Sequence, residues 1–326
     1  MRIAAWTFAC VLMSLGSASQ SWSAPPGWPD SLTIGTASPG GGYYPYGKEL
    51  AAILTEAIGI PVSAQSTQGA DQNLMLLDGG QIQLGFATMG VALQAWNGTD
   101  PRAQGKKVRS IRALFPMYDT PFEFVALDSS GVRSLRELAG KRVGAGPQGG
   151  TGASYAPKIF AALETVVTLR YGAWTTMSSE MRSGLLDGLV GAAGVPFPAL
   201  AEIDQTGETH FIELSGEDIA TLRKAMPELS PSTLPAGSFP SLKADYRTVG
   251  MFNFAVARES LPDDLVYAIT KALYANHDRL VRAYPAARES ISANVDRNAF
   301  LPFHPGAVRY YREIGVGIPA SLVSPN

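Results

Sequence analysis

The sequence feature that most constrains the fold is a block of secondary-structure signals that occurs twice in the same order. Each block runs strand, glycine-rich loop, helix, strand, short helix and strand, and the glycine loops occupy residues 38–44 and 146–152. Strands that alternate with helices favour a parallel sheet covered by helices. Any α/β chain shows some echoes of this kind, but several features recur here in one order. We therefore predict an α/β protein of two similar lobes, each presenting a glycine loop at a helix N-terminus.

Hydrophobic periodicity places the individual elements. Leu50, Ile53 and Leu54 lie at helical spacing and predict a helix over residues 47–58. Short apolar runs bounded by glycine and proline predict strands. Further strands are expected at residues 31–35, 60–66, 82–87, 141–145, 166–171 and 188–192, and further helices at 71–77, 154–163, 178–186 and 260–275.

Two further apolar segments, residues 122–127 and 248–257, are predicted to connect the lobes as strands. Chain crossings on strands would form a hinge that opens and closes a cleft. The expected organisation is therefore lobe 1 at residues 28–122 plus 253–326 and lobe 2 at 125–250, with a ligand cleft between them.

The N-terminus is typical of an exported protein. Arg2 is followed by an apolar run over residues 3–15 and by small and polar residues over 16–24. This order predicts a signal peptide at residues 1–24 and hence a periplasmic location, because the apolar run is short for a membrane span. The single cysteine, Cys10, lies inside that run, so the exported chain is expected to contain no disulfide.

Composition excludes several classes of function. The formal net charge is −2 and no basic stripe is present, which argues against nucleic acid as a partner. The three histidines are far apart and lack metal-ligand spacing, so neither a metal nor a catalytic site is predicted. Gly144, Gly146 and Gly149 match a dinucleotide fingerprint, but Pro147 occupies the turn and no acidic residue lies about twenty residues on. No cofactor is therefore expected.

The two glycine loops are the strongest candidates for a binding site. Main-chain N–H groups at a helix N-terminus favour a carboxylate or phosphate, and two facing loops would hold one anion from both sides. Polar residues that follow the predicted strands stand where ligands bind in open α/β sheets. Tyr43 and Tyr44 either cover the ligand or pack the lobe, and Asp187 either orients an ammonium group or lies in a surface turn. The predicted ligand-binding residues are Gly42, Tyr43, Tyr44, Gln65, Ser66, Thr67, Gly69, Asn73, Thr88, Gly149, Gly150, Thr151 and Asp187.

Several stretches carry a family resemblance. The most specific is IGTASPGGGYYPYG at residues 34–47, followed by AQSTQGADQNL at 64–74, and residues 138–144, 261–271 and 303–307 match as well. On these residues the chain resembles the TAXI family of TRAP-transporter solute receptors, over nearly all of the chain after residue 24. The resemblance implies a type II periplasmic-binding-protein fold, and a pocket built from the two glycine loops and the segment after the second strand. It also implies small acids such as glutamate and related dicarboxylates as ligands.

Two departures from that family bear on the ligand. The usual Gly-Ser-Gly-Thr loop is replaced by Gln148-Gly149-Gly150-Thr151, and a usual Ser-Asp pair is replaced by Met89-Gly90. The acid that would recognise an ammonium group is therefore missing, which favours a dicarboxylate or keto acid over an amino acid.

The sequence therefore predicts a monomeric, non-enzymatic receptor that binds a small organic anion, glutamate-like or dicarboxylate, and delivers it to TRAP permease subunits. A sensory binding protein that presents its ligand to a membrane receptor is one alternative. A secreted enzyme on the same scaffold is another, although no nucleophile and base pair is evident.

Overall fold

The computed structural model describes residues 25–323 apart from residues 104 and 207. The predicted signal peptide, residues 1–24, lies outside the described residues and stays a prediction. None of the described helices is long and apolar enough to cross a membrane. Within the described residues, strands and helices alternate in the order that the two sequence blocks predict.

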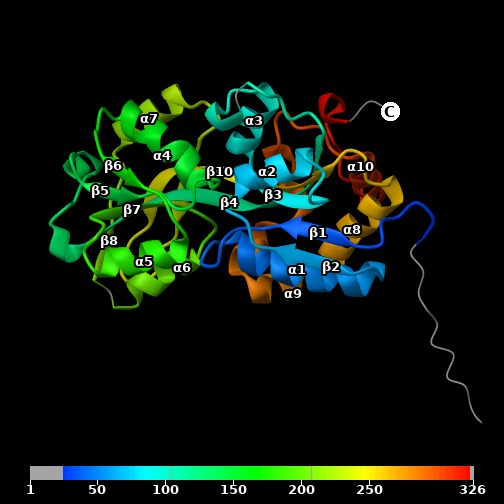
Figure 1. The fold of residues 1–326 in the computed structure, drawn as a ribbon, viewed down its shortest axis with the longest axis horizontal. Helices are drawn as coiled ribbons and strands as arrows, with labels where there is room; N and C mark the ends of the chain where they lie inside the picture. The colour runs from blue at the N-terminus through cyan, green and yellow to red at the C-terminus, as the bar shows by residue number, and fades with distance from the viewer. Residues whose placement is uncertain (1–24, 104, 207, 324–326) are drawn as a thin grey trace, which may run out of the picture.

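In the described part of the chain, ten strands form one sheet, whose main path is β2-β1-β3-β10-β4-β7-β5-β6 (Figure 1). β8 is added to β4, and β9 is added to β10. β1 pairs in parallel with β2 and β3, and β5 pairs in parallel with β6 and β7, so each sequence block forms one parallel unit. The strands are β1 (Leu32–Gly35), β2 (Val62–Gln65), β3 (Leu84–Thr88), β4 (Ile111–Leu127), β5 (Arg142–Gly144), β6 (Thr168–Arg170), β7 (Gly188–Ala192), β8 (Thr209–Phe211), β9 (Ser230–Leu234) and β10 (Tyr246–Arg258).

Two long antiparallel strands, β4 and β10, join the two units. β3 pairs with β10 over residues 253–257, whereas β9 pairs with β10 over residues 246–250. β7 pairs with β4 only from Phe122 onward. Both strands therefore pass from one unit to the other near Pro121 and Gly250, which lie opposite each other in the ladder. We call the unit that contains β1–β3 lobe 1 and the unit that contains β5–β7 lobe 2.

Both predicted connecting strands are present, and the first of them is much longer than predicted at its N-terminal end. β4 begins at Ile111, eleven residues before the predicted start at 122, because the apolar stretch continues through the preceding prolines. Pro116 is accommodated where the register with β10 shifts between Phe252 and Phe254. The crossing lies close to the predicted limits of the lobes, whose residue boundaries themselves stay a prediction.

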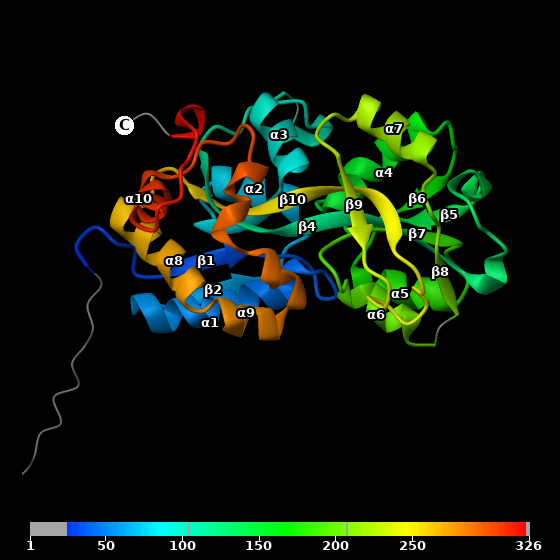
Figure 2. The ribbon, with the colours of Figure 1, turned by 180° about the vertical axis from the view of Figure 1, so that it is seen from behind.

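Helices cover both faces of each lobe. In lobe 2, α4 and α7 lie on one face and α5 and α6 on the other, while in lobe 1 α2 and α3 lie opposite α1 and α9 (Figure 1). The C-terminal helices α8–α10 return to the lobe that holds the N-terminal strands (Figures 1 and 2). The helices are α1 (Tyr43–Ile58), α2 (Ala70–Asp78), α3 (Met89–Asn97), α4 (Thr151–Ala162), α5 (Trp174–Arg182), α6 (Pro198–Ile203), α7 (Gly216–Ala225), α8 (Asp263–Ala275), α9 (His277–Ala283) and α10 (Pro305–Glu313).

Local sequence explains why the helices near the cleft begin and end where they do. In α1, Leu50, Ile53 and Leu54 are buried on the face that packs on the sheet, as predicted. The helix ends at Gly59, whose φ of 75° is the left-handed conformation that glycine adopts at little cost. It begins at Tyr43 rather than at the predicted residue 47, because Pro45 is tolerated in a first turn whose N–H groups have no partner within the helix.

α5 and α8 also begin at residues other than those predicted. α5 begins at Trp174, four residues before the predicted 178, and ends at Arg182 because Gly184 has a left-handed φ of 71°. α8 begins at Asp263 rather than at 260, and its N-cap is Pro262, with no side-chain cap. The earlier start of α5 matters for function, because it brings Trp174 to the edge of the cleft.

Candidate ligand-binding site

A cavity lies between the two lobes, and Tyr118 of the connecting strand β4 forms part of its wall. The space that the centre of a water molecule can occupy there is about 40 Å³. Such a space holds on the order of three ordered water molecules, so it suits a small ligand. None of the described residues that line it carries a charged side chain. The lining residues are Ala37, Gly41, Gly42, Tyr43, Gln68, Gly69, Ala70, Tyr118, Gly150, Thr151, Gly152, Trp174, Ala192 and Ala193.

Two helices, one from each lobe, begin at this cavity. α1 of lobe 1 begins after Gly42, and α4 of lobe 2 begins after Gly150. Neither helix has a side-chain hydrogen bond at its N-cap. The first N–H groups of a helix have no partner within it, and the helix dipole adds partial positive charge at that end. The cavity therefore offers backbone donors and positive potential from both sides, without a cationic side chain.

The start of a third helix, α2, is occupied by the opposite lobe. The backbone N–H groups of Asp71 and Gln72 lie 3.0 and 3.3 Å from the carbonyl oxygen of Gly149, to which they donate. In return, the N–H of Gly149 donates to Oε1 of Gln68 at 2.9 Å. These bonds cap α2 with lobe 2, so the structure shows the lobes closed on each other.

Glycine is required where the segment between β2 and α2 in lobe 1 touches the glycine loop of lobe 2. Gly69 has a φ of 126°, a conformation that L side chains rarely adopt, and a Cβ atom there would lie 3.0 Å from Cα of Gly150. A Cβ atom at Gly149 would lie 2.9 Å from Cβ of Gln68 and 3.0 Å from Cβ of Gln72. The glycines thus serve close approach of the lobes as well as access to the ligand.

Side chains add further contacts between the lobes. Thr88 and Thr151 lie with their hydroxyl oxygens 3.1 Å apart. Arg102, in the short helix η1 (Pro101–Ala103), donates to Oγ of Ser154 at 2.6 Å and forms an ion pair with Asp71 at 3.1 Å. Burial and the neighbouring Asp100 carboxyl raise the pKa of Asp71 to about 7, against the opposing attraction of the guanidinium group. Arg102 thus ties α2 in lobe 1 to α4 in lobe 2.

The structure brings part of the predicted set together at the cavity. Gly42, Tyr43, Gly69, Gly150 and Thr151 line it. Thr88 and Gly149 lie beside it, in contacts between the lobes.

Four other predicted residues shape the loops. Asn73 donates to the carbonyl oxygens of Thr36 at 2.9 Å and Phe86 at 3.0 Å, and it accepts from Thr67 at 2.8 Å. Ser66 donates to the carbonyl oxygen of Ala37. Gln65 is exposed, and its backbone oxygen accepts from Thr36. These contacts hold the first glycine loop against the sheet.

Two predicted residues lie away from the cavity. Asp187 is held by Arg142 through bonds of 2.9 and 3.1 Å at the start of β7. This ion pair lowers the pKa of the Asp187 carboxyl, and Asp187 is not among the residues that line the cavity. Tyr44 points away from the cavity, with Nζ of Lys48 over its ring at 5.5 Å.

Sequence reasoning missed the aromatic walls of the cavity. Tyr118 comes from the hinge strand β4, and Trp174 comes from the start of α5. The ring of Trp174 packs edge-on against Phe197 at 4.8 Å and lies over Gly146, whose φ is 73°. A tryptophan just after a predicted strand end was a usable signal, whereas the position of Tyr118 depends on how the hinge strands cross.

The tyrosines at the cavity differ in whether their hydroxyl group has a hydrogen-bond partner. Tyr43 donates to Oδ1 of Asn253 on β10 at 2.5 Å, so its ring forms the wall while its hydroxyl binds the hinge. The hydroxyl of Tyr118 is buried and has no hydrogen-bond partner among the described residues. Burial raises the pKa of Tyr118, so the group remains a neutral donor. Buried polar groups are nearly always hydrogen-bonded, so a ligand or a water molecule is the expected partner of this hydroxyl.

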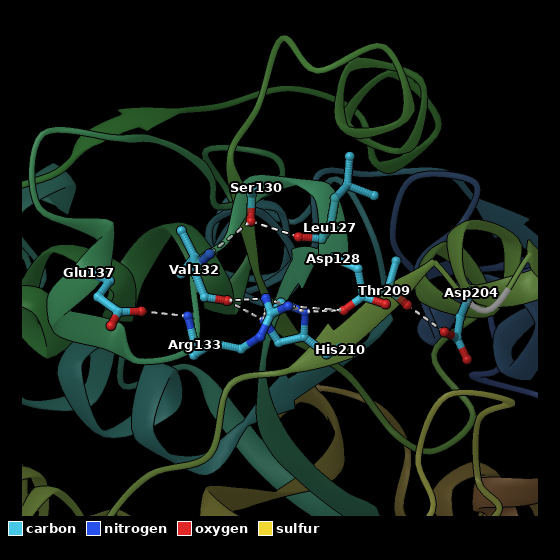
Figure 3. Close-up of polar contacts among 9 residues, drawn as sticks. All are labelled: Leu127, Asp128, Ser130, Val132, Arg133, Glu137, Asp204, Thr209 and His210. Atoms are coloured by element: carbon cyan, nitrogen blue, oxygen red, sulfur yellow. Dashed lines mark hydrogen bonds and ion pairs between the residues drawn. The ribbon is translucent and has the colours of Figure 1, made fainter.

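The histidines have structural surroundings. Figure 3 shows the His210 ring between Asp128 and the backbone of Val132, with Arg133 beside it. Its Nδ1 lies 2.9 Å from Oδ1 of Asp128, and its Nε2 contacts the carbonyl oxygen of Val132, so both ring nitrogens are engaged. His304 accepts from the N–H of Gly306 and caps α10. Among the described residues, no group of three potential metal ligands is close enough to bind a metal ion.

A family comparison agrees with this architecture. Residues 34–315 match the model of the NMT1-like family. The chain belongs to the NMT1-like family. This match spans both lobes and all the residues that line the cavity.

Solved structures resemble the NMT1-like protein over most of its length. The periplasmic binding protein BugD has a TM-score of 0.56 at 13% identity, over 89% of this chain and 99% of that one. A periplasmic transporter protein has a TM-score of 0.55 at 12% identity, over 79% and 87% of the two chains. An ancestral arginine-binding protein bound to arginine has a TM-score of 0.50 at 17% identity, over 79% and 98%. The predicted type II periplasmic-binding-protein fold is confirmed.

Proposed function

We propose that this NMT1-like protein is a periplasmic solute-binding protein that closes on a small carboxylate without an ammonium group and delivers it to a TRAP-type permease. The observation that carries the proposal is the cavity between the lobes, which receives the N-termini of α1 and α4 and is lined by no described charged side chain. A carboxylate would accept bonds from backbone N–H groups of both lobes at once, and so would stabilise the closed form.

The residues that line the cavity also indicate which other groups the ligand carries. An amino acid needs an acceptor for its ammonium group, because burying that charge unpaired is costly. Among the lining residues, Gln68 and Thr151 offer neutral oxygens but no carboxylate. Tyr118 offers a hydroxyl that can donate to a carbonyl or to a second carboxylate. These features favour a dicarboxylate or keto acid over glutamate.

Delivery to a permease has separate support. The similar solved structures are described as a periplasmic binding protein, a periplasmic transporter protein and an arginine-binding protein. Residues 34–47 resemble the TAXI receptors of TRAP transporters, and residues 1–24 have the pattern of an export signal. The mechanism is closure of the lobes, with no bond made or broken.

A ligand panel tests the proposal. The exported protein is screened by thermal shift with acetate, pyruvate, succinate, 2-oxoglutarate and glutamate, and positive ligands are measured by calorimetry. We expect one or more carboxylates without an amine to raise the Tm, because a ligand of the folded state alone stabilises it. Tight glutamate binding without dicarboxylate or keto-acid binding would refute the ligand class. Failure of the whole panel would refute the function.

A further inference from the structure

A buried carboxyl group stands close to the cavity without a partner. Glu123 lies on β4, opposite Gly191 of β7, and its side chain is fully buried. Neither of its carboxyl oxygens has a hydrogen-bond partner among the described residues. Burial alone raises the pKa of Glu123 well above its ordinary value. In the closed structure this group is therefore a neutral carboxylic acid.

The groups that face Glu123 do not compensate a negative charge. The facing residues are Gly191 on β7 and Phe197, which directly precedes α6, and neither is titratable. The titratable groups that face it are the hydroxyls of Tyr246 on β10 and Tyr284, which follows α9. Both hydroxyls donate elsewhere, to the carbonyl oxygens of Ile212 and Gly194. An ionised Glu123 would thus be buried without a counter-ion or a donor.

The Glu123 carboxyl lies against Gly191 in lobe 2, and one nearby hydroxyl group comes from lobe 1. Gly191 and Phe197 belong to lobe 2, whereas Tyr284 comes from the C-terminal part of lobe 1. The hydroxyl of Tyr284 crosses to lobe 2 by donating to the oxygen of Gly194 at 2.6 Å, and it also lies against Gly42 of the cavity wall. Opening of the lobes would break the bond between Tyr284 and Gly194 and would expose this side of the carboxyl group to water. The surroundings of Glu123 thus depend on closure.

We propose that closure of the lobes over the ligand takes up one proton from solution, and that Glu123 carries it. In the open form the carboxyl is hydrated and ionised at neutral pH, since an ordinary glutamate has a pKa of about 4.3. Closure converts the carboxylate to a carboxylic acid, and the proton comes from the buffer. The inference rests on the proposed ligand-driven closure.

The sign of the pH dependence follows from linkage. The closed form binds one more proton than the open form at a pH between the two pKa values of Glu123, so it is favoured as the pH falls. Ligand affinity should therefore weaken by up to about tenfold for each pH unit of increase in that range. Below the pKa of the open form, Glu123 is neutral in both forms and its contribution becomes constant.

Asp71 is the second group at the interface that could take up a proton on closure, because its pKa in the closed structure is raised to about 7. The experiment therefore compares Asp71→Asn with the double variant Asp71→Asn/Glu123→Gln. Gln is neutral and has nearly the size of the carboxylic acid, so the cavity around position 123 is preserved.

Calorimetric titrations with succinate, pyruvate and 2-oxoglutarate at about pH 7, in buffers of different ionisation enthalpy, give the number of protons taken up per ligand. Asp71→Asn should take up about one proton and lose affinity as the pH rises. The double variant should take up none and bind with an affinity that does not change with pH. The same measurement on the wild-type chain tests for uptake if a variant fails to fold.

The outcomes separate this inference from the function on which it rests. Binding by Asp71→Asn or by the wild-type chain without proton uptake overturns the role of Glu123 and leaves the proposed function intact. Uptake that persists in the double variant overturns it as well. If none of the three carboxylates binds the wild-type chain, the proposed function falls and this inference falls with it.

Discussion

At the scale of single residues, the site depends on atoms that are absent or unpartnered rather than on charged side chains. Gly69, Gly149 and Gly150 lack the Cβ atoms that would separate the segment before α2 from the glycine loop of lobe 2. Tyr118 lines the cavity, and its buried hydroxyl has no described hydrogen-bond partner. Each feature costs little in the open protein and becomes important only when the lobes meet around a ligand.

Adding one methyl group at the loop contact should hinder closure without affecting folding. In Gly149→Ala, the new Cβ atom would lie 2.9 Å from Cβ of Gln68 in the opposite lobe. We expect affinity for the carboxylate to fall at least about tenfold, which corresponds to ~1.4 kcal/mol. The Tm without ligand should hardly change. The matched control is Gly216→Ala, where a Cβ atom meets nothing within 4 Å and affinity should be unchanged. Equal affinities in the two variants, measured by calorimetry, would contradict the prediction.

Removing the free hydroxyl should affect binding and spare stability. Tyr118→Phe loses no hydrogen bond to a described residue, so its free energy of unfolding should be unchanged or slightly higher. Ligand affinity should fall by about 0.5–1.5 kcal/mol, the net value of one hydrogen bond. Tyr46→Phe is the contrast, because its hydroxyl bonds to Ser290 at 3.1 Å outside the cavity. That variant should lose stability and keep its affinity. The reverse pattern, seen by denaturation and calorimetry, would show that Tyr118 is only structural.

At the scale of elements, three helix N-termini meet at the interface between the lobes. α1 and α4 face the cavity, and α2 is capped by the carbonyl oxygen of Gly149 from lobe 2. A carbonyl oxygen thus accepts bonds from the start of α2, and the proposed carboxylate would accept bonds from the starts of α1 and α4 in the same region. Arg102 reinforces this arrangement from η1 by contacting both α2 and α4.

Loss of the arginine that links α2 to α4 should accelerate ligand release. Arg102→Met removes the bond to Ser154 and the pair with Asp71, and both contacts span or flank the interface. We expect affinity to fall about three- to tenfold, the range for a partly exposed charged hydrogen bond. Arg182→Met is the control, because its ion pair with Glu202 lies within lobe 2. Stopped-flow dissociation rates that match in the two variants would argue against a role for Arg102 in closure.

At the scale of the whole molecule, the two lobes are joined by β4 and β10 (Figures 1 and 2). They touch through Gly149 and Gln68, through Arg102 and through Tyr284. Two strands allow a bending motion that leaves the core of each lobe unchanged. Several contacts between the lobes at the cleft are hydrogen bonds, and a ligand that bridges the lobes would add to the stability of the closed form.

Ligand should therefore change the shape of the protein in solution. We expect the radius of gyration from small-angle scattering to decrease when a binding carboxylate is added, because the lobes rotate about β4 and β10. Gly149→Ala should show a smaller decrease at saturating ligand. An identical radius with and without ligand in the wild-type chain would mean that closure does not accompany binding.

Much of this organisation could be predicted from the sequence, because it depends on local signals. The two glycine loops, the alternation of strands and helices and the apolar segments of the hinge are properties of short stretches. They predicted the two-lobed fold and the positions of Gly42, Tyr43, Gly150 and Thr151 at the cavity. Helix starts were less accurate, as in α5, because a helix whose first turn lacks apolar periodicity gives a weak signal.

Only the tertiary structure decided the roles that depend on distant parts of the chain. Asp187 is bound by Arg142, 45 residues earlier, and does not line the cavity. Tyr118 reaches the cavity because β4 crosses beside β10, and Glu123 is buried beside Gly191 and Phe197, which come from a distant part of the chain. A sequence specifies which side chains a strand carries, but their burial and partners arise from the packing of remote elements. The sequence therefore determined that two glycine loops would form a cleft, and the tertiary structure decided which groups face the ligand.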